Sequence, residues 1–136
     1  MRSSMLGLIV TIGLFGACAA GSAADQQVTL TDVSIEVASV IEAGPVRFLI
    51  DNRGSELHEY EVFSGARRGM VLPVSSSVAD TSGLRLLDEV ENLFPGNQGI
   101  LTIDLEPGTY LVLCNLPDHY ERGMWATIDV VAAEGG

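Results

Sequence analysis

The chain has 136 residues and a formal net charge of -11 at pH 7, from 7 Lys+Arg and 18 Asp+Glu. This length indicates one domain, and the shortage of cations excludes a protein that binds nucleic acid through its phosphates. A hydrophobic content of 47% excludes a disordered chain, and two Cys are too few for a disulfide framework or a multi-Cys zinc site.

The first residues have the three-part plan of a secretory signal peptide. Arg2 carries a positive charge, an apolar run extends from Met5 to Phe15, and small residues continue to Ala24. The run is short for a transmembrane helix, which needs about 20 residues, and an N-terminal membrane anchor is the alternative. We therefore predict a signal peptide over residues 1–24 and an exported, periplasmic or cell-envelope protein.

Cys18 gives this segment a second interpretation. Gly16-Ala17-Cys18 resembles the lipobox of bacterial lipoproteins, with Phe15 where Leu is usual. A lipid anchor at Cys18 is then the one contact with a membrane that we expect. Ser22-Ala23-Ala24 offers an ordinary cleavage site instead.

The remaining chain, residues 25–136, is predicted to form one domain of short strands, because apolar residues alternate with period two. The predicted faces are Val33/Ile35/Val37, Val46/Phe48/Ile50, His58/Tyr60/Val62, Leu101/Ile103/Leu105, Tyr110/Val112/Cys114 and Met124/Ala126/Ile128/Val130. Leu111 and Leu113 are apolar on the opposite face, which predicts that their strand is central. The pattern indicates an all-β fold, a β-sandwich of antiparallel-type strands. Segment 84–90 fits a strand or a short helix, and the loop Ser64–Gly83 has no assignment.

Three residues near the C-terminus have the chemistry of a metal site. Cys114, His119 and Met124 follow one another in a C-x4-H-x4-M pattern, and Pro117-Asp118 between them favours a loop. The other histidine, His58, begins a strand on an apolar face. Each residue alone is more often part of a core, but the single Cys and the two His of the predicted domain fall at compatible positions.

A thiolate, two imidazoles and a thioether form a soft donor set, which copper prefers. Two His and one Cys with a distant axial Met define the blue-copper electron-transfer site. We therefore predict one copper ion held by His58, Cys114, His119 and Met124.

On these residues the chain resembles the cupredoxins, the plastocyanin- and azurin-like blue copper proteins, and in particular an exported bacterial plastocyanin-like group. The segments that carry the resemblance are FLIDNRGSELHEYEV, ENLFPG, LEPGTYLVLCNLPDHYERGM and WATIDVV. The resemblance implies a Greek-key fold and one mononuclear type 1 copper with the four ligands above. It also implies that the N–H of Glu59 donates to the Cys114 sulfur and that the Asn115 side chain ties the two ligand loops together. Many members have Gly before the second His, where this chain has Asp118.

The function that follows is transfer of single electrons between redox partners outside the cytoplasm, by a monomer that is not an enzyme. The partners expected are redox proteins, a cytochrome or a copper oxidase or reductase. The apolar contact patch is predicted from Leu116, Pro117, Pro95 and Trp125, and an acidic rim from Glu56, Glu59, Asp118 and Glu121.

Other functions fit less well. A copper-binding or delivery protein of the cell envelope would use the same ligands, but carriers favour exposed Met/His clusters. A copper oxidase needs more His for a second centre, and zinc does not use Met. Glu59 beside His58 would suit a red-copper-like site, but strand alternation points its carboxylate away. A Cys114–His119 hydrolase dyad lacks a helix N-terminus to activate the thiol.

Overall fold

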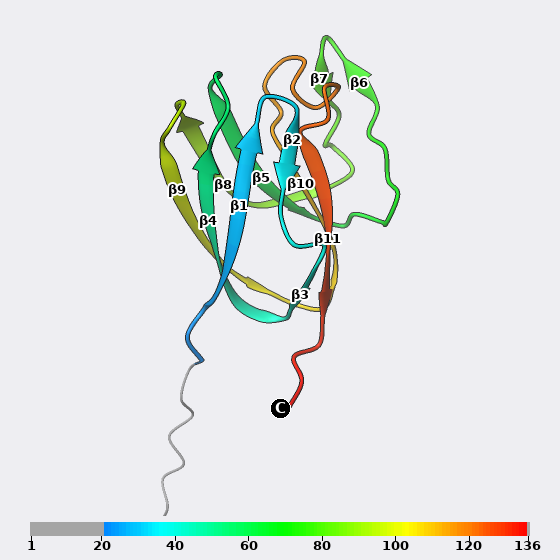
Figure 1. The fold of residues 1–136 in the computed structure, drawn as a ribbon. Coiled ribbons are helices and arrows are strands. Elements are labelled where there is room, and N and C mark those ends of the chain that lie inside the picture. The colour runs from blue at the N-terminus through cyan, green and yellow to red at the C-terminus, as the bar shows by residue number, and fades with distance from the viewer. Residues whose placement is uncertain (1–20, 136) are drawn as a thin grey trace, which may run out of the picture.

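The computed structural model describes residues 21–135. It consists mainly of two β-sheets packed face to face (Figure 1). The first sheet has the order β2-β1-β4-β9, from β1 (Ala24–Thr31), β2 (Ser34–Glu36), β4 (Gly44–Asn52) and β9 (Gln98–Leu105). The second has the order β3-β11-β10-β5-β8, from β3 (Val40–Glu42), β5 (His58–Ser64), β8 (Arg85–Leu93), β10 (Gly108–Leu113) and β11 (Trp125–Val131). A small hairpin, β6 (Val74–Ser75) and β7 (Val78–Ala79), lies beside them. The predicted all-β sandwich is confirmed.

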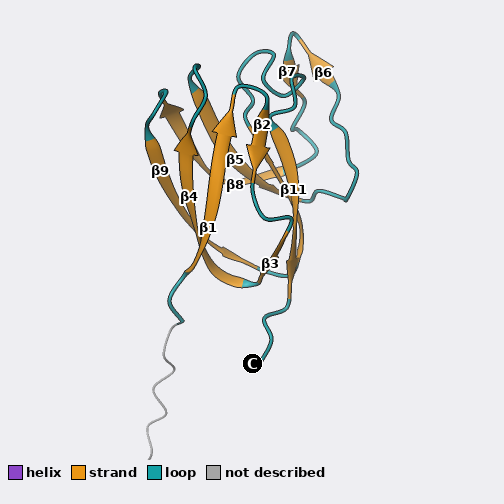
Figure 2. Cartoon of the chain, viewed as in Figure 1, coloured by secondary structure: helices purple, strands orange, loops and turns teal. Residues whose placement is uncertain are grey.

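Strands and loops make up the whole described part of the chain (Figure 2). Within residues 21–135 there is no helix with the length and hydropathy needed to cross a membrane. The predicted signal peptide, apart from its last residues, and Cys18 lie outside the described residues. Ala24, the last residue of that predicted peptide, already pairs with Val46 in β1 and β4.

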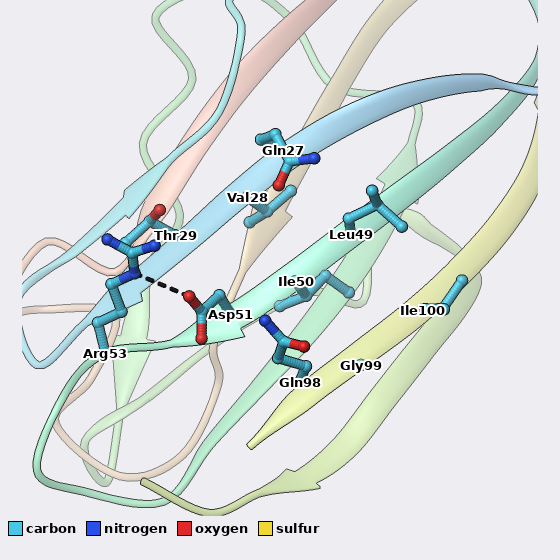
Figure 3. Close-up of a pocket in the computed structure, with 10 residues that line it drawn as sticks. All are labelled: Gln27, Val28, Thr29, Leu49, Ile50, Asp51, Arg53, Gln98, Gly99 and Ile100. Carbon is cyan, nitrogen blue, oxygen red and sulfur yellow. Dashed lines mark hydrogen bonds and ion pairs between the residues drawn. The ribbon is translucent and has the colours of Figure 1, made fainter. Parts of the chain in front are cut away.

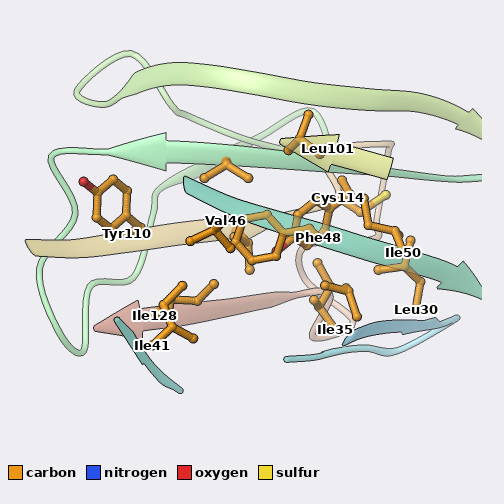
Figure 4. Packing of buried hydrophobic residues seen from close by; sticks show 14 of the residues in the cluster. Leu30, Ile35, Ile41, Val46, Phe48, Ile50, Leu101, Tyr110, Cys114 and Ile128 are labelled. Carbon is orange, nitrogen blue, oxygen red and sulfur yellow. The ribbon is translucent and has the colours of Figure 1, made fainter. Parts of the chain in front are cut away.

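The core lies between the sheets and is built by the predicted alternation (Figure 4). In β4, Val46, Phe48 and Ile50 are fully buried, while the residues between them face outward. Burying one such side chain stabilises the fold by roughly 1.5–3 kcal/mol. Cys114, the residue directly after β10, belongs to this cluster.

β10 is the central strand that the sequence predicts, with β11 on one side and β5 on the other. Tyr110 and Val112 point into the main core, whereas Leu111 and Leu113 point to the outer face of the sheet. The segment 64–84 covers that outer face and forms a second cluster with it. The buried members of this cluster are Phe63, Leu72, Ala79, Leu111, Leu113 and Tyr120.

Three expectations need correction or completion. Val33 is 58% exposed, because it lies in the turn between β1 and β2 instead of in a strand with Ile35. Segment 84–90 is strand for most of its length, since β8 runs over Arg85–Leu93. The sheets are mixed, because β1 pairs with β4 and β3 with β11 in parallel, while the other pairs are antiparallel.

The hairpin β6–β7 has a two-residue turn, Ser76-Ser77, with φ of 53° and 65°. Such turns favour Asn-Gly because both positions need positive φ. We expect Ser76→Asn with Ser77→Gly to stabilise the protein by about 1 kcal/mol, which raises Tm by roughly 4–8 °C in thermal unfolding. Alanine at both positions serves as the control and should lower Tm; equal Tm values for the two variants would contradict this account of the turn.

Candidate metal centre

Three donor atoms from two distant segments of the chain meet at one end of the sandwich. The Nδ1 atoms of His58 and His119 lie 3.1 Å apart, and the Cys114 Sγ lies 3.3 Å from Nδ1 of His119. All three residues are buried, and each offers a ligand atom within 4.8 Å of the others. The structure therefore brings together the Cys and both His residues that the sequence singled out.

Local structure explains this convergence. His58 is the first residue of β5, and the loop 114–124 connects β10 to β11 at the same end of the sandwich (Figure 1). The loop closes on itself: Cys114 N–H donates to the Met124 carbonyl at 3.0 Å, and Met124 N–H donates to the His119 carbonyl at 3.1 Å. Met124 is fully buried in the same core cluster as Cys114. Its sulfur stays a predicted ligand.

The contacts of Glu59 follow one expectation and correct another. Its N–H donates to the Cys114 sulfur at 3.4 Å, as the resemblance implied. Its carboxylate points to the other side of β5, where it accepts from the N–H of Asn115 at 3.0 Å. This bond, between Glu59 and the Asn115 main chain, ties the two ligand segments together. The Asn115 side chain instead binds both main-chain groups of Ala79 in β7, because the hairpin covers it.

Trp125 does not belong to the predicted apolar patch. It stacks on Tyr120 with ring centroids 5.9 Å apart and packs against the second cluster, under segment 64–84. The alternation of β11 explains this, since Met124 and Ala126 face the core and Trp125 therefore faces outward.

The sequence did not reveal which residues contact the Nε2 atoms of the two imidazoles. Nε2 of His58 lies 3.1 Å from the Asp32 carboxylate, and Nε2 of His119 lies 3.0 Å from that of Glu56. Asp32 falls in a segment that reads as part of a strand, so no local pattern pointed to it. Asn52 was also missed as a buried group; its side chain binds the carbonyls of Glu56 and Leu93 and so fixes the loop before His58.

The surroundings shift the protonation of the donors. Burial raises the pKa of the Cys114 thiol to about 11, so near neutral pH it ionises only when a cation replaces its proton. Burial lowers the pKa of His119, and the charges of Arg122 and His58 lower it further. Neutral imidazoles are the form that binds metals.

The donor set fits copper. Two imidazole nitrogens and one sulfur lie within 4.8 Å of one another, so one cation between them could bind all three. Thiolate and imidazole together favour copper or zinc over magnesium or calcium, which take oxygen ligands. Glu59 does not join the group, because its carboxylate is held by Asn115.

A hollow lies on the outer face of the first sheet, over β1, β4 and β9 (Figure 3). It is lined by Gln27, Val28, Thr29, Leu49, Ile50, Asp51, Arg53, Gln98, Gly99 and Ile100. None of the donor residues lines it, so this hollow is not part of the centre.

No family model matches the chain. Curated relatives include the iron uptake system component EfeO of Escherichia coli K12 and of Shigella flexneri, 28% identical over 107 residues. The match takes in 76% of this chain but 24% of each relative, so the chain spans about a quarter of their length.

Solved structures resemble this chain over most of its length. Reduced auracyanin from Roseiflexus castenholzii has a TM-score of 0.61 at 17% identity, covering 82% of this chain and 99% of that one. Rusticyanin from Thiobacillus ferrooxidans has a TM-score of 0.56 at 21% identity, covering 81% and 79%. Auracyanin A from Chloroflexus aurantiacus, described as a "blue" copper protein, has a TM-score of 0.55 at 15% identity, covering 79% and 100%. These neighbours are cupredoxins, and the chain has the cupredoxin fold.

Proposed function

We propose that this chain is an exported type 1 (blue) copper protein that carries single electrons between redox partners and has no substrate chemistry. Its copper ligands would be His58, Cys114, His119 and Met124. The observation that supports the proposal is the convergence of His58 Nδ1, Cys114 Sγ and His119 Nδ1 at a buried end of a cupredoxin fold.

Copper bound by these donors would supply a one-electron couple. The chain contributes a site that is held in place before the metal binds, since main-chain hydrogen bonds close the loop 114–124 and link Glu59 to both Cys114 and Asn115. Burial of the donors keeps water away from them. Both properties let the ligands keep one arrangement as an electron arrives and leaves.

The proposed partners are redox proteins outside the cytoplasm, met by a monomer through the end of the sandwich that holds the centre. Pro95 and Pro117 are exposed in the loops at this end, and the neighbouring Phe94 is 57% exposed. Asp118 and Glu121, also exposed, supply part of the proposed acidic rim.

If the rim steers a cationic partner, electron exchange with a basic cytochrome should slow at least several-fold as salt rises from low to physiological concentration. Stopped-flow mixing at several ionic strengths measures this. An electron-exchange rate that does not change with salt concentration would contradict steering, and the proposed copper site would be unaffected.

A second candidate is a metal-binding role in the cell envelope without electron transfer. It is favoured by the curated relatives, which are components of an iron uptake system. A lipid anchor at Cys18 would suit either role.

The visible spectrum of the purified protein after addition of Cu(II) tests the proposal. We expect an intense blue band that disappears in Cys114→Ser, because the band requires a thiolate bound to copper. Met124→Leu should keep the band but move it, and Met70→Leu, in the second cluster, should leave it unchanged. Weak bands alone in the wild-type protein would contradict type 1 copper and leave the metal-binding role as the better candidate.

A further inference from the structure

Both imidazoles of the centre have a carboxylate on the side away from the donor cluster. Nε2 of His58 lies 3.1 Å from Oδ1 of Asp32, in the turn between β1 and β2. Nε2 of His119 lies 3.0 Å from Oε2 of Glu56, in the loop between β4 and β5. A carboxylate at this position accepts a hydrogen bond from Nε2–H, which keeps the proton on Nε2 and leaves the lone pair of the ring on Nδ1.

Asp32 is held firmly in this role. Its oxygens accept from the N–H of Ser55 at 2.8 and 3.0 Å, from the Ser55 hydroxyl at 2.7 Å and from the N–H of Glu56 at 3.1 Å. Gly54 gives it room: a Cβ at this position would come within 2.2 Å of Asp32 Oδ1 and 2.7 Å of His58 Nε2. The chain therefore reserves space for the contact between this carboxylate and His58.

Glu56 is held instead by an ion pair with Arg122. Arg122 donates to its two oxygens at 3.2 and 2.7 Å, from the same loop that carries His119. The Glu56 side chain is 44% exposed, whereas that of His119 is 8% exposed. Glu56 thus covers the outer edge of His119, and Arg122 offsets part of its negative charge.

We propose that Asp32 and Glu56 are positioning residues of the metal centre, which present both Nδ1 lone pairs to the metal and favour Cu(II) over Cu(I) by their negative charge. Carboxylates on the far side of ligating imidazoles fix the tautomer and make the ring a stronger donor, which stabilises the more highly charged ion. Arg122 opposes Glu56. The inference rests on the proposed copper site and deepens it, because it assigns the residues that set the reduction potential.

The test compares the reduction potentials of Asp32→Asn, Glu56→Gln and Arg122→Met with the wild-type value. Each carboxylate variant should change the ratio of Cu(II) to Cu(I) affinity by about fivefold in favour of Cu(I). At 59 mV per tenfold change this is a potential about 40 mV higher. Arg122→Met should lower the potential, and Glu121→Gln, which removes an exposed charge from the same loop, should change the ratio less than twofold.

The carboxylate variants and Arg122→Met should shift the reduction potential in opposite directions. This separates the proposed role from a merely structural one, because damage to the loops would not move the potential in both directions. Changes below twofold in both carboxylate variants, or an Arg122→Met shift in the same direction as Glu56→Gln, would overturn the proposal. Glu56 is exposed enough that its variant tests the idea even if Asp32→Asn fails to fold.

A second measurement reads the tautomers without copper chemistry. In the Zn(II)-loaded protein, nitrogen NMR should show Nε2 protonated in both imidazoles, with the Nε2–H signal of His58 shifted in Asp32→Asn and that of His119 shifted in Glu56→Gln. Protonated Nδ1 in either ring, or unshifted signals in both variants, would overturn the proposal. A wild-type protein without a blue band contradicts the proposed function, and the positioning role then stands or falls on this spectrum.

Discussion

Gly123→Ala is expected to destabilise the protein by about 3 kcal/mol, measured as the free energy of unfolding in urea. Gly123 has φ of +112°, a backbone conformation that alanine rarely adopts, and a Cβ there would lie 2.7 Å from the carbonyl oxygen of Val33. That oxygen belongs to the main chain of the turn after β1, so it cannot move aside cheaply. Because Met124 follows directly, the substitution should also move the blue band, if the protein binds copper as proposed.

Two other glycines separate strain from contact in this result. Gly44 has φ of +120° with open space around it. Gly44→Ala should therefore lower the free energy of unfolding through backbone strain alone, by about 1–2 kcal/mol. Gly83→Ala, where the Cβ also meets open space, should change stability by less than about 0.5 kcal/mol. If Gly123→Ala cost no more than Gly44→Ala, the contact with Val33 would contribute nothing.

Glu61→Gln is expected to stabilise the protein, increasingly so as the pH rises from 5.5 to 7. Burial, together with the charges of Glu59, Glu89 and Glu91, raises the pKa of Glu61 to about 8 from 4.5. The folded protein therefore keeps a proton through a pH range in which the unfolded chain has lost it. Unfolding releases this proton, so the stability of the wild-type protein falls as the pH rises through that range.

Glutamine removes this dependence because it does not ionise. The difference in unfolding free energy between Glu61→Gln and wild type should grow by at most about 1.4 kcal/mol per pH unit. Urea titrations at several pH values with a chelator present measure it without a contribution from metal. Glu42→Gln, at an exposed position in β3, is the control. Parallel stability curves for Glu61→Gln and wild type between pH 5.5 and 7 would show that Glu61 is ionised in the fold.

The sequence predicted features that depend on local periodicity or on rare residue types. Alternation in Val46, Phe48 and Ile50 marked the core face of β4, since neighbouring side chains of a strand point to opposite sides. The donor residues were found because Cys114 and His119 share a short loop and His58 is the one other histidine. The fold class followed from these same patterns.

The tertiary structure decided which groups surround those donors. Asp32 and His58 are 26 residues apart, and Glu59 and Asn115 are 56 apart, so no spacing in the sequence relates them. The segment 64–84, with few alternating residues, acquires its place only by covering Leu111 and Leu113. Such contacts depend on how the sheets and loops pack in space, whereas periodicity in one segment reports only the local geometry of that segment.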